Sequence, residues 1–60
     1  MKRIETTKGL QTLLKRYEEA NASEYWLNVV KGCIAEGLAM DEDDYNNTPQ
    51  ELKPLWNRLK

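Results

Sequence analysis

Apolar residues recur at the spacing of an α-helix in three separate runs, and this periodicity constrains the fold more than any other feature of the chain. No stretch alternates apolar and polar residues for long enough to form a strand. Because the chain has only 60 residues, it can form one domain with a thin core. The sequence therefore predicts an all-α fold, a compact three-helix domain over residues 1–60 with helices at about 7–20, 22–39 and 49–59.

The first run predicts an amphipathic helix over residues 7–20. Thr6 or Thr7 can cap its start with a side-chain oxygen. Its apolar side chains fall within an arc of about 120°. They are Leu10, Leu13, Leu14, Tyr17 and Ala20.

The second run is apolar around about half of the helical circumference. Asn21 can cap its start together with Glu24, and Gly37 can end it, although an extension to Met40 is slightly favoured. Since two short neighbours cannot cover so wide a surface, we expect this helix to lie between the other two and to leave apolar surface for a further contact. The apolar set is Trp26, Leu27, Val29, Val30, Cys33, Ile34, Leu38 and, in the longer form, Met40.

The acidic stretch 41–47 is expected to be a solvated connector, because four carboxylates at a helix C-terminus oppose the helix dipole. Asp41, Asp43 and Tyr45 alternate as in a calcium-binding loop. However, the glycine and the glutamate that such a loop needs at its sixth and twelfth positions are missing. No metal site is therefore predicted.

The segment 48–51, with the sequence TPQE, has the pattern of a capped helix start. It predicts a short third helix over residues 49–59. Pro54 forfeits one backbone hydrogen bond, so we expect a kink there. The alternative is a single turn at 49–52 followed by a new helix from Pro54.

The sequence offers few of the side chains that usually act in catalysis. The chain has no histidine, and Cys33, its one cysteine, lies on the apolar face of the second helix, which favours a packed thiol over a nucleophile. A disulfide within the chain and a Cys/His zinc site are excluded on the same count. The N-terminus lacks the apolar region of a signal peptide, and no membrane span is visible. We expect a cytoplasmic protein without cofactor, metal or enzymatic activity.

The charges are sorted along the chain although the net charge is −1. Residues 17–47 carry eight carboxylates against Lys31 alone, whereas both ends are net basic. A solvated surface is the simpler interpretation, but such sorting also suits electrostatic complementarity with a partner or a second copy. Tyr25 lies off the apolar stripe of its helix, and exposed aromatics are common interface anchors.

These features predict a non-enzymatic protein–protein interaction protein. It would be a small regulator, inhibitor or adaptor of the kind common in phages and mobile elements, which presents helix faces to a protein partner or to a second copy of itself. The predicted interaction residues are Tyr25, Trp26, Glu36, Asp41, Asp43, Asp44 and Tyr45. The alternative is a small DNA-binding regulator that uses the C-terminal helix and a basic N-terminal region, although the acidic second helix disfavours nucleic acid. The basic N-terminal residues are Lys2, Arg3, Lys8, Lys15 and Arg16.

Overall fold

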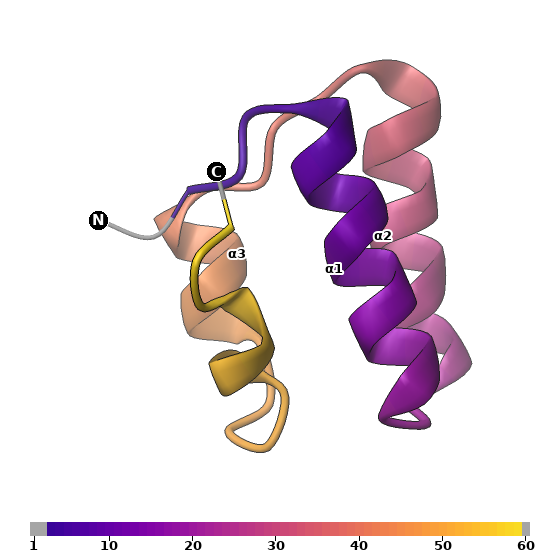
Figure 1. Ribbon diagram of the computed structural model, residues 1–60, viewed down its shortest axis with the longest axis vertical. Coiled ribbons are helices and arrows are strands. Elements are labelled where there is room, and N and C mark those ends of the chain that lie inside the picture. The colour runs from indigo at the N-terminus through magenta and orange to yellow at the C-terminus, as the bar shows by residue number, and fades with distance from the viewer. Residues whose placement is uncertain (1–2, 60) are drawn as a thin grey trace.

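The computed structural model describes residues 3–59. Its elements are α1 (Thr7–Glu19), α2 (Glu24–Glu36), α3 (Glu42–Asn47) and a short 3-10 helix, η1 (Lys53–Trp56). Figure 1 shows α1 and α2 side by side as a helical hairpin, with α3 and the C-terminal segment across from them. The predicted all-α, three-helix fold is confirmed. None of the helices in the described range has the length and apolar character that a membrane span requires.

Side-chain capping starts α1 where the sequence predicts it. The Oγ1 atom of Thr6 accepts a hydrogen bond from the backbone N–H of Gly9 at 3.0 Å. This bond satisfies one of the amides that the first helical turn leaves free. The predicted start of the first helix is therefore confirmed.

Residues in the left-handed conformation end both long helices. Asn21 and Gly37 have φ angles of 58° and 68°. After each of them, the next amide donates to the carbonyl five residues earlier, which closes the helix. The slightly favoured extension of the second helix to Met40 is therefore wrong. Asn21 ends α1 and does not cap α2, whose N-cap residue is Ser23.

The acidic stretch 41–47 contains a helix, so its prediction as a connector is wrong. The side chain of Asp41 accepts hydrogen bonds from the amides of Asp43 and Asp44 at 3.1 and 3.3 Å. In return, the Asp44 carboxylate accepts from the amide of Asp41 at 3.0 Å. The carboxylates thus lie in the first turn of α3, where the helix dipole stabilises them, and do not extend α2.

The predicted helix over residues 49–59 is wrong as a continuous element. Thr48 is buried and ends α3, where its hydroxyl donates to a carbonyl of the same helix at 2.8 Å. It therefore does not cap a following helix. Residues 49–52 form a turn, and η1 follows with Pro54 near its start. The alternative of a turn and a new helix near Pro54 describes the structure better.

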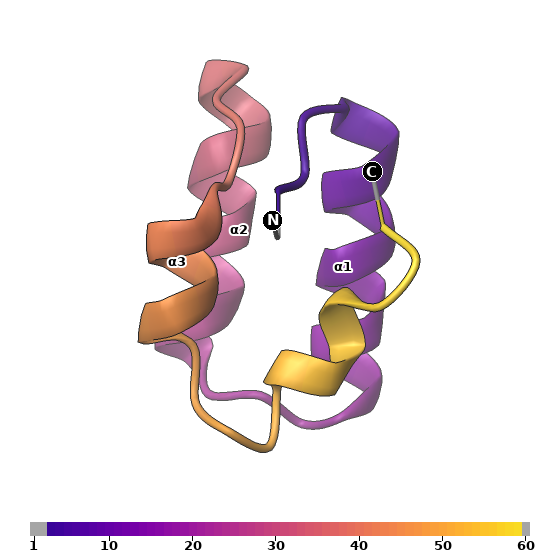
Figure 2. The same cartoon turned by 90° about the vertical axis from the view of Figure 1, so that its left-hand side faces the viewer.

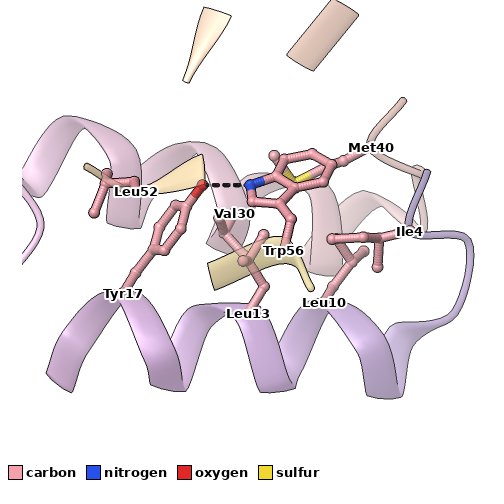
Figure 3. Close-up of a cluster of buried hydrophobic side chains, with 8 residues drawn as sticks. All are labelled: Ile4, Leu10, Leu13, Tyr17, Val30, Met40, Leu52 and Trp56. Carbon is pink, nitrogen blue, oxygen red and sulfur yellow. Dashed lines mark hydrogen bonds between the residues drawn. The ribbon is translucent and has the colours of Figure 1, made fainter. Parts of the chain in front are cut away.

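The first helix, and not the second, lies at the centre of the fold. α1 packs against both α2 and η1, so the prediction that the second helix lies between the other two is wrong. α1 supplies three large side chains to the core, whereas Val30 is the single fully buried residue of α2. Figure 3 shows the buried apolar cluster, which comprises Ile4, Leu10, Leu13, Tyr17, Val30, Met40, Leu52 and Trp56.

Two sets of hydrogen bonds hold the C-terminal segment against α1. The Nε1 atom of Trp56 donates to the Oη atom of Tyr17 at 2.9 Å inside the core (Figure 3). The Nη1 atom of Arg16 donates to the carbonyls of Leu55 and Asn57, each at 2.8 Å, and so satisfies backbone groups at the end of η1. Because these partners belong to α1, the C-terminal segment covers α1 and leaves α2 partly open.

The N-terminal arm also contributes to the core, although no helical pattern in the sequence predicts this. Ile4 and Met40 form an antiparallel backbone bridge with N···O distances of 2.8 and 3.0 Å. Both side chains are buried. Figure 1 shows the arm running alongside the segment that joins α2 to α3.

Replacing Tyr17 by Phe tests the buried hydrogen bond. The indole N–H of Trp56 would lose its partner, so we expect the free energy of unfolding to fall by about 1–3 kcal/mol in urea titrations followed by circular dichroism. The control is Tyr25→Phe, which removes an exposed hydroxyl and should change stability by less than about 0.5 kcal/mol. Equal effects of the two variants would show that this hydrogen bond does not stabilise the fold.

Replacing Asp41 by Ala tests the cap of α3. We expect a loss of about 0.5–2 kcal/mol of stability, measured by the same titration. Asp43→Ala removes the same charge from the same helix end, but the Asp43 side chain caps no backbone amide, so its effect should be less than half as large. If the two variants are equally destabilised, charge alone accounts for the effect and the cap does not.

Candidate interaction surface

An aromatic pair at the start of α2 is the most accessible apolar feature of the structure. The Tyr25 side chain is 66% exposed, and its ring meets the ring of Trp26 edge to face with the centroids 4.9 Å apart. Trp26 is half-buried and packs against the core from its edge. The predicted exposure of Tyr25 is confirmed. Trp26, which belongs to the predicted apolar set of its helix, has one side available to solvent.

A hollow of about 300 Å³ lies beside Trp26. One wall is the turn between α1 and α2, and the other is the turn that precedes η1. Trp26, Pro49 and Leu52 provide its apolar surface, and Glu51 is the charged residue among those that line it. The complete lining is Ala20, Asn21, Ala22, Ser23, Trp26, Pro49, Glu51 and Leu52. Such a hollow can accept an apolar side chain while a carboxylate at its edge attracts a cation.

Sequence reasoning missed this hollow because its two walls are distant along the chain. Residues 49–52 were predicted to form the first turn of a helix, whose place relative to residues 20–23 no local pattern specifies. The one sequence signal for the hollow is the run of small side chains in the turn after α1, because small side chains leave space beside Trp26.

The other predicted interaction residues do not join this surface. Glu36 lies at the far end of α2, about 16 Å from Tyr25 along the helix axis at about 1.5 Å per residue. The Tyr45 ring is half-buried and meets the core residue Trp56 edge to face at 5.3 Å. Trp26 is therefore the predicted interaction residue that lines the hollow, and the Tyr25 ring lies against it.

The acidic residues predicted for interaction lie at the start of α3, where two of them form hydrogen bonds with the backbone of that helix. Asp41 and Asp44 form the reciprocal cap, and Asp43 is exposed beside them. Within residues 3–59, no group of three or more His, Cys, Asp or Glu side chains is arranged to hold a metal ion. These carboxylates thus stabilise a helix start.

Cys33 is half-buried on α2. Burial raises the pKa of its thiol above the ordinary value of 9.0, and the negative charges of Asp44 and Glu36 raise this pKa further. The thiol is therefore protonated at neutral pH, and a protonated thiol is a poor nucleophile.

The DNA-binding alternative needs a recognition helix near the C-terminus, and the described part of the C-terminal region forms only the four-residue η1. Lys2 and Lys60, which belong to the basic ends, lie outside the described residues.

Comparison with protein-family models, with curated proteins and with solved structures found no match to this chain. Its function must therefore be inferred from its own side chains.

The environment of Cys33 predicts slow alkylation. At a pH of about 8, iodoacetamide should modify Cys33 more slowly in the folded protein than in urea, because the raised pKa lowers the thiolate fraction. Because the folded protein disfavours the thiolate, the thiol contributes its full share to the free energy of unfolding at neutral pH. This contribution is lost as the pH rises above 9.0 and the thiol ionises. Mass spectrometry of the alkylated product gives both rates.

Glu36→Gln should increase the alkylation rate of Cys33 in the folded protein. Glu24→Gln, which removes a distant charge from the same helix, should leave this rate unchanged. A folded protein that reacts as fast as the unfolded chain would contradict the assigned environment.

Proposed function

We propose that this protein is a non-enzymatic interaction protein, a small regulator, inhibitor or adaptor, that binds an apolar segment of another protein at the start of α2. The observation that carries the proposal is the exposed ring of Tyr25 held against Trp26 at the edge of a hollow. Aromatic side chains that are rigid before binding lose little conformational freedom when a partner docks, and they dominate many interfaces.

The next turn of α2 supports an interface on this side of the molecule. Val29, four residues after Tyr25, is partly exposed. Scattered single apolar residues are normal on a monomer. Here Val29 follows Tyr25 by one helical turn on the same flank of α2, so a partner docked on Tyr25 can also cover it.

The charges around the hollow favour a basic partner. Glu51 lines it, and Glu18, Glu19 and Glu24 are exposed on either side of the adjacent turn. No lysine or arginine is among the lining residues. The partner segment should therefore carry an apolar or aromatic anchor flanked by Lys or Arg, whose charges complement this rim.

A second copy of this chain fits the same surface less well. In a symmetric dimer the surface meets itself, so Glu24 and Glu51 of one copy would approach those of the other. Like charges brought together at an interface weaken it. We therefore assign the surface to a different protein.

Selection from a displayed peptide library tests this assignment. We expect enriched peptides with a Trp, Phe or Leu anchor next to basic residues. Their affinity, measured by calorimetry, should fall at least about tenfold (about 1.4 kcal/mol) in Tyr25→Ser. Glu51→Gln should also weaken binding and reduce its salt dependence.

Leu38→Ser is the matched control, because it removes another exposed apolar side chain, 54% exposed, beyond the other end of α2 and should leave the affinity unchanged. Enriched peptides without basic residues, or equal losses in the Tyr25 and Leu38 variants, would overturn the proposal. So would sedimentation that shows a dimer which Tyr25→Ser dissociates.

A further inference from the structure

A second hollow, of about 310 Å³, lies between α1 and the C-terminal segment. Figure 2 shows this segment, in yellow, running beside α1 toward the helix start. The hollow is open to solvent and lies away from the aromatic pair of α2. Its lining residues are Thr6, Lys8, Gly9, Thr12, Arg16, Arg58 and Leu59.

The lining gathers cations from both basic ends of the chain. Lys8 and Arg16 belong to the first end, and Arg58 belongs to the last. No carboxylate is among the lining residues. The ion pair found within residues 3–59 joins Arg3 and Glu5, so none of the three lining cations is neutralised by an acidic side chain there. An anion in the hollow would relieve their mutual repulsion.

Arg16 is fixed in place before any ligand arrives. Its Nη1 atom donates to two backbone carbonyls at 2.8 Å, whereas its Nε and Nη2 atoms have no partner in the described part of the chain. A guanidinium that is already oriented loses less freedom when its remaining N–H groups bind an anion. Arg58, with a φ of 64°, is held in the left-handed region, which non-glycine residues rarely adopt. Arg58 is the third cation that lines the hollow.

We propose that this hollow binds a small phosphate-bearing anion through Lys8, Arg16 and Arg58. Guanidinium groups match phosphate oxygens in pairs, and a lysine adds a third positive charge. A concave site with three cations suits a compact multivalent anion such as pyrophosphate better than the long backbone of a duplex. The site is separate from the interaction surface at α2, so each can be tested without the other.

Titration of the whole protein with pyrophosphate at low salt tests the proposal. We expect saturable binding by calorimetry, with amide chemical shift changes concentrated at Gly9, Thr12 and Arg58. Lys8→Ala and Arg58→Asn should each weaken binding at least about threefold. Asn is chosen at position 58 because it tolerates the left-handed backbone. Arg16 is left intact because its hydrogen bonds support the fold.

Lys31→Ala is the matched control, because it removes one positive charge from α2, outside the hollow, and should leave the affinity within about 1.5-fold of the unaltered protein. Circular dichroism verifies that each variant is folded. Absence of saturation at about 10 mM pyrophosphate, or an equal loss in the Lys31 variant, would overturn the proposal. So would a short DNA duplex that binds more tightly than pyrophosphate and weakens steeply with salt, which would indicate nucleic-acid binding instead.

Discussion

The hydrogen bond between Trp56 and Tyr17 is the contact on which the arrangement of this small fold depends. It joins two buried aromatic side chains that are 39 residues apart in the chain, and it satisfies the indole N–H. A thin core cannot tolerate an unpaired polar group of this kind, since its cost of about 1–3 kcal/mol is a large share of the stability of a 60-residue domain. The neighbouring Arg16 completes the attachment through the backbone of the same C-terminal segment.

Both candidate sites follow from this attachment. Because the C-terminal segment lies on α1, it brings Arg58 to Lys8 and Arg16 and forms the cationic hollow. The same placement brings the turn 49–52 beside Trp26 and leaves much of α2 uncovered. The sorted charges of the sequence thus become two distinct surfaces, an acidic rim around an apolar hollow and a basic hollow without carboxylates.

Local sequence signals predicted the two long helices well and the rest poorly. The start of α1 and the exposure of Tyr25 were predicted correctly, since capping and helical periodicity act over only a few residues. The acidic run was assigned wrongly, because carboxylates that oppose the end of one helix equally favour the start of the next, and the choice depends on where the first helix stops. Glu36 is acidic and Tyr45 is aromatic, like the residues of the candidate surface, but the fold places both of them elsewhere.

By itself, the sequence determined that the chain is helical, where α1 begins and which face of each long helix is apolar, because these properties depend on neighbours within one or two turns. Only the tertiary structure decided that α1 rather than α2 occupies the centre, that Ile4 pairs with Met40, and that residues distant along the chain line common hollows. The physical reason is that periodicity records which face of a helix is apolar and not which element covers that face. Which element covers α1 depends on the hydrogen bonds of the Trp56 indole and the Arg16 guanidinium. The partners of these two groups lie far from them along the chain.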